Sequence, residues 1–232
     1  SGFSDFAGST LVHACGGAAA LAGVIVLGPR EGRFGTKGEK KSMVPFAASS
    51  IPLVVLGTFL LWFGWFGFNG FSQLAMGTFD DVNAITTIAV NTHLAGAAGT
   101  VVGAALTRLI GGKTDIVMML NGALAGLVAI TAEPLTPDPL LAMLIGGIGA
   151  VIMYFGTKFL ESQKIDDVVG AIPVHMFAGI FGTLVVPMSN PDTNFGSQLL
   201  GVISVCIFSF VLSYIVFKAL KEPIGLRTVS YT

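Results

Sequence analysis

The stretch Asp5-Phe-Ala-Gly-Ser-Thr-Leu-Val-His13 decides the fold of this chain, because its pattern returns far downstream. The second copy reads Asp167-Val-Val-Gly-Ala-Ile-Pro-Val-His175, and the two copies align at the Asp, the Gly, the last Val and the His. An Asp followed eight residues later by a His is a rare pattern to find twice in a chain with only three histidines. Both histidines lie in apolar segments, where an ionisable side chain suggests a functional site.

The composition is that of an integral membrane protein. Hydrophobic residues make up 53% of the 232 residues and charged residues only 11%, whereas a soluble domain carries about 25% charged residues. The apolar runs are continuous and lack the alternation of transmembrane strands, so we expect helices rather than a β-barrel. The 31 glycines lie mostly within these runs, which favours close packing of one helix on another.

Seven apolar segments can each cross a bilayer, which takes about 20 residues. They cover residues 7–28, 46–69, 84–107, 114–132, 139–160, 168–188 and 197–219. The connections between them leave no room for a soluble domain, so we predict a single membrane domain over residues 1–232. The predicted fold class is all-α: a polytopic membrane protein with seven transmembrane helices.

The positive charges predict the orientation of these helices. Every Lys and Arg lies in the first, third or fifth connection or at the C-terminal end, and the connections 70–83, 133–138 and 189–196 have none. Lys and Arg are enriched in cytoplasmic connections. We therefore expect a multi-pass protein of the plasma or inner membrane of the cell, with its N-terminus outside and its C-terminus in the cytoplasm.

With this topology, the helices of His13 and His175 run in opposite directions and carry the two imidazoles near the bilayer midplane. This is the arrangement of an inverted repeat, whose functional site lies at the repeat interface. A single buried His is usually structural, but two at equivalent depth can share one hydrogen bond and stay neutral. We predict a functional pair that takes a proton from a cationic substrate or relays it. Asp5 and Asp167 precede the two helices, and we interpret both as N-caps, leaving open a part for Asp5 in cation attraction.

An aromatic stretch ends the second segment. Trp65, Phe68 and Ser72 are spaced i, i+3 and i+7, so they share one helix face. An aromatic belt at the membrane surface is one interpretation. The other, which we favour for Trp65 and Phe68, is a recognition site for a small cation at a pore mouth. His93 has no counterpart in the repeat, and we interpret it as structural.

The sequence contains no phosphate-binding loop, no nucleophile set and no metal-ligand cluster. Its two cysteines lie in apolar runs, and its net charge of −1 gives no reason to expect a nucleic-acid partner. We expect no enzymatic activity, no metal and no cofactor.

These motifs resemble the ammonium transporter (Amt/Mep/Rh) family, and the wording of the first is closer to the Amt branch. The stretches that carry the resemblance are residues 5–13, Phe63–Asn69, Asn91–Ala95, Asp166–Gly182 and the closing Ile224–Arg227. The resemblance implies an eleven-helix inverted-repeat fold of which this chain holds the last seven helices, the first four being absent. It also implies a homotrimer in the lipid bilayer with a pore for ammonium or ammonia in each subunit, and a PII-type regulatory protein on the cytoplasmic face.

The resemblance implies a role for each candidate site residue. His13 and His175 correspond to the twin pore histidines, and Asp5 to a largely structural Asp at the outer mouth. Phe68 corresponds to one of two gating phenylalanines, Trp65 lines the pore, and Ser72 belongs to the outer recruitment site. The other gating phenylalanine would lie in the absent helices.

Two other classes share this topology. An ammonium sensor would need a signalling domain after Arg227, and residues 228–232 are too few for one. A seven-helix retinal protein would need a Lys in mid-helix, whereas Lys218 lies at the end of the last segment.

Overall fold

The computed structural model describes residues 2–34 and 46–226, and every regular element in these two ranges is helical. In chain order the elements are η1 (Ser9–Ala14), α1 (Cys15–Leu27), α2 (Ile51–Gly70), η2 (Phe71–Gln73), α3 (Phe79–Gly111), α4 (Ile116–Ile130), α5 (Pro139–Ser162), η3 (Ile172–Phe177), α6 (Ala178–Leu184), η4 (Val186–Met188) and α7 (Phe195–Lys221). The predicted all-α fold class is confirmed. Lys37, Lys40, Lys41 and Arg227, which contributed to the predicted orientation and tail, lie outside the described residues.

All seven predicted segments are helical, but two are shorter than the predicted spans. Five helices are long and apolar enough to cross a membrane: Ser9–Leu27, Ile51–Gln73, Phe79–Gly111, Pro139–Ser162 and Phe195–Lys221. The other two are Ile116–Ile130 and Ile172–Met188. At about 1.5 Å per residue, the first of these reaches about 22 Å, less than the apolar core of a bilayer.

The short α4 can end early because the N-terminal segment bonds its last carbonyl groups. The backbone N–H of Phe6 donates to the carbonyl of Ala132 at 2.7 Å, and the Ser9 hydroxyl donates to the carbonyl of Val128 at 2.6 Å. In apolar surroundings an unpaired carbonyl is costly, so a broken helix needs such partners. The same bonds fix the start of the His13 motif against α4.

The long α3 begins at Phe79, five residues before the predicted segment. Thr78 and Asp81 form a capping box, in which the Thr78 hydroxyl accepts from the Asp81 N–H at 3.1 Å and the Asp81 carboxylate accepts from the Thr78 N–H at 3.0 Å. Such a cap starts a helix with polar residues, and hydropathy therefore misses its first turns.

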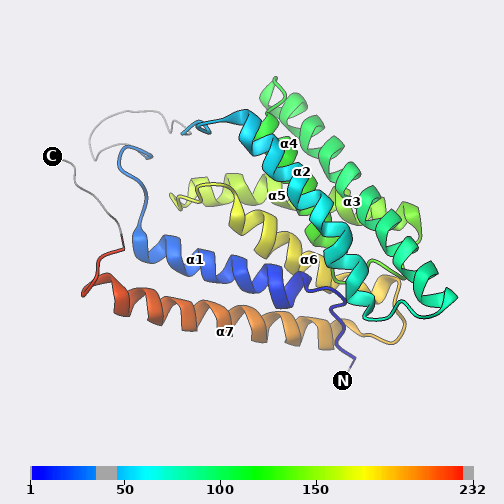
Figure 1. Ribbon diagram of the computed structural model, residues 1–232. Helices are drawn as coiled ribbons and strands as arrows, with labels where there is room; N and C mark the ends of the chain where they lie inside the picture. Colours follow the sequence, from blue (N-terminus) through cyan, green and yellow to red (C-terminus); the bar gives the residue numbers. More distant parts are fainter. Residues whose placement is uncertain (1, 35–45, 227–232) are drawn as a thin grey trace.

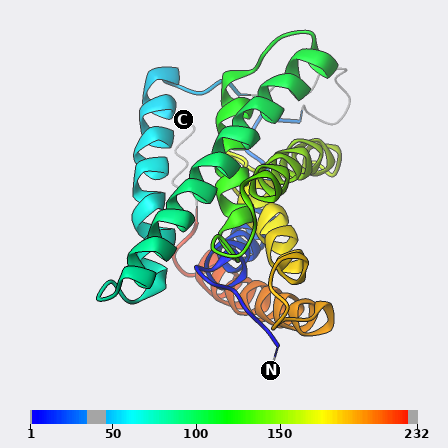
Figure 2. The ribbon, with the colours of Figure 1, turned by 90° about the vertical axis from the view of Figure 1, so that its right-hand side faces the viewer.

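The helices form two packed groups joined by α6. α1 and α7 lie side by side and run in the same direction, while α3, α4 and α5 pack on one another with α2 against α3 (Figure 1). Figure 2 shows α2 upright at one side and α3 running diagonally across the molecule, with α1 and α7 foreshortened below. Glycines allow the closest approaches: a Cβ added to Gly122 would lie 2.6 Å from the carbonyl oxygen of Gly99. This backbone contact between α3 and α4 is the small-residue packing predicted from the composition.

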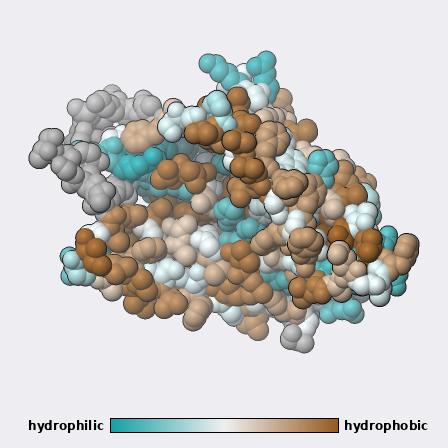
Figure 3. Space-filling model, viewed as in Figure 1, coloured by the Kyte–Doolittle hydropathy of each residue, from teal (hydrophilic) through white to brown (hydrophobic). Residues whose placement is uncertain are grey.

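The outer surface is apolar. Hydrophobic side chains cover much of the face in Figure 3, and rings such as Phe63 and Phe208 are 78% and 70% exposed. Water would oppose so much exposed apolar area, so this surface is suited to lipid or to further protein. The first described residues and the end of α7 lie at opposite ends of the α1–α7 pair (Figure 1), as an odd number of crossings requires.

Candidate functional site

His13 of η1 and His175 of η3 face each other where their two helices cross. Their Nδ1 atoms are 3.2 Å apart, and their ring centroids are 5.2 Å apart with the planes inclined by 19°. A hydrogen bond between two Nδ1 atoms requires one ring to donate and the other to accept, so the two neutral imidazoles must be different tautomers. The structure thus brings together the two residues that the repeat pairs.

Each histidine lies in a π-helical turn that follows a glycine. The turns are Ser9–Ala14 and Ile172–Phe177, and the preceding Gly8 and Gly170 have φ angles of 104° and 79°. Residues with a side chain rarely adopt such angles, which explains why both copies of the motif hold glycine at this position. π-Turns are rare and occur frequently at functional sites.

A second pair of matched glycines lies at the crossing itself. A Cβ added to Gly17 would lie 2.5 Å from the backbone nitrogen of Met176, and one added to Gly179 would lie 3.2 Å from the backbone nitrogen of Ala14. Met176 and Ala14 are the residues that follow the two histidines. Each glycine therefore lets the backbone next to the other helix's histidine come into contact.

Trp65 of α2 stacks on His13. Their ring centroids are 4.9 Å apart with the planes inclined by 13°, and Trp65 is only 6% exposed. This burial excludes the surface-belt interpretation of Trp65 within the chain. The indole Nε1 donates to the Thr131 hydroxyl at 2.9 Å, and this hydroxyl donates to the carbonyl of Leu127 at 2.7 Å. Thr131 was not among the predicted site residues.

Phe68 lies beside both rings, and the residue is 39% exposed. Its centroid is 5.6 Å from that of His13 and 5.9 Å from that of Trp65. Ser72, in η2, is one turn further on, and its hydroxyl donates to the carbonyl of Phe68 at 2.8 Å. Phe68 and Ser72 therefore lie at the edge of the cluster, and Trp65 with the two histidines forms its interior.

The two aspartates lie at the starts of the histidine helices. Asp5 Oδ2 accepts from the backbone N–H groups of Thr10 and Leu11 at 3.0 and 2.8 Å. Asp167 accepts in the same way, Oδ1 from Gly170 and Ala171 and Oδ2 from Ile172, at 2.7–3.1 Å. These are the bonds of a helix-capping carboxylate. Burial nevertheless raises the pKa of Asp5, against the opposing effect of its hydrogen bonds.

The cluster leaves a buried nitrogen, His13 Nε2, for a ligand. This atom has no hydrogen-bond partner among the described residues. A site with neutral imidazoles, an indole and a phenyl ring can hold a small polar molecule by one hydrogen bond and by its ring faces. Within residues 2–34 and 46–226, no group of His, Cys, Asp and Glu side chains could hold a metal ion.

His93 lies apart from this cluster, on the exposed side of α3. Its ring centroid is 5.5 Å from that of Trp62 and 6.2 Å from that of Phe66. It therefore contacts Trp62 and Phe66 of α2 rather than either ring of the histidine pair.

Comparison with known proteins gives a consistent result over the whole chain. The family model described as the Ammonium Transporter Family matches residues 1–232. Ammonium transporter Amt2 of Archaeoglobus fulgidus is 39% identical over 97% of this chain, and a putative ammonium transporter of Synechocystis sp. is 38% identical over 99%. The chain spans about half the length of the curated relatives it matches, 51% and 54% for these two.

Solved structures share this fold. A protein described as a sensor Amt protein superposes with a TM-score of 0.90 at 36% identity, covering 98% of this chain and 57% of that one. Mep2 of Candida albicans superposes with a TM-score of 0.83 at 27% identity, covering 96% of this chain and 51% of that one.

Proposed function

Because this chain belongs to the ammonium transporter family, we propose that it provides the histidine-bearing part of a pathway that carries ammonium or ammonia across a membrane. The contact between His13 and His175 carries the proposal, with Nδ1 atoms 3.2 Å apart and Trp65 stacked on one ring. The family is one of transporters rather than enzymes, and nothing in this cluster requires a covalent step.

The proposed path begins at the edge of the aromatic cluster. Phe68, Trp65 and Ser72 form the outer mouth, where an ammonium ion loses water and gains contact with aromatic faces, worth about 0.5–2 kcal/mol. The ion loses its proton near the mouth, and ammonia passes the histidine pair, where His13 Nε2 is free to bond it. A bare cation at the bilayer centre costs several kcal/mol, so separating the proton from the amine lowers the barrier. Potassium has no proton to give and is excluded.

The histidine pair is suited to move the proton as well as to bind ammonia. One imidazole donates its Nδ1–H to the other, so a proton gained at one ring can be matched by a proton lost from the other. Asp5 and Asp167 cap the two helices and hold the pair at its depth. The 232 residues act as one membrane domain, oriented with the N-terminus outside and the C-terminus in the cytoplasm, within a homotrimer that a PII-type protein binds from the cytoplasm.

The test is ammonium-evoked current in proteoliposomes, with potassium as the control ion. Because the relatives are about twice as long, the chain is reconstituted alone and fused to the part of Archaeoglobus fulgidus Amt2 that the match leaves uncovered, which we expect to precede it. The fusion should carry an ammonium-specific current. A fusion that inserts but carries none would contradict the proposal.

The histidines are tested in the same fusion. Replacing both His13 and His175 by Phe should abolish the proton-coupled current, whereas His93→Phe should leave it intact because His93 contacts Trp62 and Phe66 rather than the pair. Unchanged current in the double variant would refute the proton relay while leaving ammonium transport itself standing.

Ammonium sensing is a second candidate function, favoured by one observation. The solved structure that superposes with a TM-score of 0.90 is described as a sensor Amt protein. In a sensor the same cluster would bind ammonium without sustained flux. Saturable ammonium binding by the fusion, combined with no current, would favour sensing over transport.

A further inference from the structure

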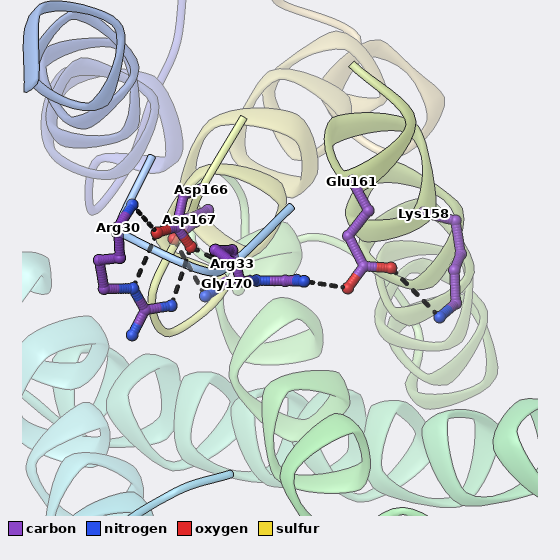
Figure 4. A network of polar contacts seen from close by, with 7 residues as sticks. All are labelled: Arg30, Arg33, Lys158, Glu161, Asp166, Asp167 and Gly170. Carbon is purple, nitrogen blue, oxygen red and sulfur yellow. Dashed lines mark hydrogen bonds and ion pairs between the residues drawn. The ribbon is translucent and has the colours of Figure 1, made fainter. Parts of the chain in front are cut away.

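The connection that leaves the His13 helix is bonded to the start of the His175 helix. α1 ends at Leu27, and three residues later Arg30 makes three hydrogen bonds to Asp166, from its backbone N, its Nε and its Nη2, each 2.8 Å long (Figure 4). Since one of these donors is the backbone N–H, the bonds fix the path of the chain as well as the side chain. Two parallel bonds from a guanidinium to a carboxylate also fix orientation.

Asp166 is the buried centre of a larger polar network. Its side chain is 2% exposed, and Arg33 also approaches the oxygen that Arg30 Nη2 bonds, with Nε 3.6 Å from Oδ1. Arg33 Nη2 also bonds Glu161 at 3.0 Å, and Glu161 pairs with the exposed Lys158 at 3.4 Å. Figure 4 shows the chain of contacts running from Arg30 through Asp166 and Arg33 to Lys158. A surface ion pair would be worth little, but breaking a buried pair leaves a charge without a partner.

The residue after Asp166 begins the His175 helix. Asp167 accepts backbone N–H bonds from Gly170, Ala171 and Ile172, and these residues lead directly into η3. Two adjacent carboxylates thus bind two different segments. Asp166 binds the connection that leaves the His13 helix, and Asp167 binds the first turn of the His175 helix. We call the Arg30–Asp166 pair the inner clamp.

Two helices that touch at one crossing can still pivot about it. Gly17 and Gly179 provide the crossing beside the histidines, and contacts at a distance from it limit the pivot. The Thr10 and Thr183 hydroxyls, 2.7 Å apart, make one such contact. The inner clamp is another such contact, because it lies beyond the end of α1 and nine residues before His175. We propose that Asp166 is a positioning residue for the histidine pair, which Arg30 holds so that the His13 and His175 rings stay in hydrogen-bond contact. This inference rests on the proposed role of the pair in ammonium transport.

The test measures the NMR signals of the histidine imidazoles. The protein has only three, so labelling its histidines with 15N gives imidazole signals from His13, His175 and His93, the last being an internal reference that contacts Trp62 rather than the pair. In the 232-residue chain, held in lipid nanodiscs, Asp166→Asn and Arg30→Gln should each shift the Nδ1 signals of His13 and His175 toward those of separate imidazoles. The His93 signal should not move. Combining the two substitutions should add little, because either one opens the clamp.

Lys158→Gln is the matched control. It removes the outermost ion pair of the same network without touching Asp166, so the signals of His13 and His175 should stay as in the wild type. Arg30→Lys serves if Asp166→Asn fails to fold, because it keeps the charge but loses the two parallel bonds. Signals of His13 and His175 that remain at wild-type positions in folded Asp166→Asn or Arg30→Lys protein would overturn the inference, whatever the stability of the variants.

Measuring ammonium current per amount of inserted protein distinguishes a positioning role of Asp166 from a simple loss of folded protein. For inserted protein, maximal ammonium current should fall about tenfold to a hundredfold in Asp166→Asn, because a misplacement of about 1 Å can cost about a hundredfold. The half-saturating ammonium concentration should change little, since Phe68 and Ser72 are untouched. Absence of current in the wild-type fusion would count against the proposed function alone, because the 15N signals report on the clamp without transport.

Discussion

Gly17 lies directly against the backbone of Met176, the residue that follows His175. Gly179 lies against the backbones of Ser9 and of Ala14, the second of which follows His13, so each glycine contacts the chain next to the other helix's histidine. In both copies of the motif the glycine comes four residues after the histidine. The spacing places the contact one turn beyond each imidazole, where it sets how closely the two rings approach.

Substituting Gly17 by Ala should therefore separate the histidines. The added Cβ would lie 2.5 Å from the Met176 backbone nitrogen, and since a backbone atom cannot rotate away, the helices must move apart. Forcing extra volume into a packed contact costs about 1–3 kcal/mol. Thermal unfolding in detergent should show the loss of stability. The 15N signals of the histidines should show the loss of the hydrogen bond between them.

Its neighbour Gly16 provides the control. A Cβ on Gly16 would meet no other heavy atom within 4 Å, and Ala is the better helix former by up to about 1 kcal/mol. Gly16→Ala should leave stability unchanged or raise it. Equal losses from the two substitutions would mean that the contact at Gly17 does not hold the pair.

Thr131→Val should tilt Trp65 away from His13. Val has nearly the shape of Thr but no hydroxyl, so the buried indole N–H loses its acceptor, at a cost of about 1–3 kcal/mol. We expect a shift in tryptophan fluorescence and a weaker ammonium current in the reconstituted protein. Thr100→Val is the comparison, because the Thr100 hydroxyl bonds only the Gly96 carbonyl of its own helix. A Thr131 variant that behaves like the Thr100 variant would contradict a role for the bond.

The histidine pair could be predicted from sequence because its signal is a repeated spacing of rare residues. Asp5 and His13 match Asp167 and His175 at the same interval, and the resemblance to the family extends to Trp65 and Phe68. The seven helical segments were predictable for a related reason, since hydropathy reports burial in lipid. Their ends were not, because polar caps such as Thr78 with Asp81 lie outside the apolar run.

Other parts of the site carry no distinct sequence signal. Thr131 follows an ordinary apolar helix, and its bond to Trp65 joins residues 66 positions apart. Arg30 counts in the sequence only as one positive charge on the expected cytoplasmic side, whereas its role depends on a partner at Asp166. Gly8 and Gly170 did match in the repeat, but glycine is too common in this chain for the match alone to indicate left-handed backbone.

Asp5→Asn should change how stability depends on pH. Burial raises the pKa of Asp5, so the folded protein binds a proton to higher pH than the unfolded chain does. The corresponding stability is complete below the unfolded pKa and is lost as the pH rises through the folded pKa. Asn keeps an oxygen for the N–H groups of Thr10 and Leu11 and cannot ionise. The Asp5→Asn variant should therefore not lose this stability as the pH rises. The control Asp192→Asn, at an exposed position, should lose it as the wild type does. Unfolding midpoints measured from about pH 4 to 7 would test both expectations.

The inner clamp should respond to pH in the opposite sense. Hydrogen bonds from Arg30 hold the pKa of Asp166 below its ordinary value of 3.8, so the folded protein binds fewer protons at this group than the unfolded chain does. The stability from the clamp is then complete above the unfolded pKa and is lost as the pH falls through the folded pKa. Arg30→Gln should lower the unfolding midpoint by a constant amount between about pH 5 and 8, and this difference from the wild type should shrink below about pH 4. A difference that persists unchanged in acid would mean that Arg30 stabilises the fold by packing rather than by its bond to the Asp166 carboxylate.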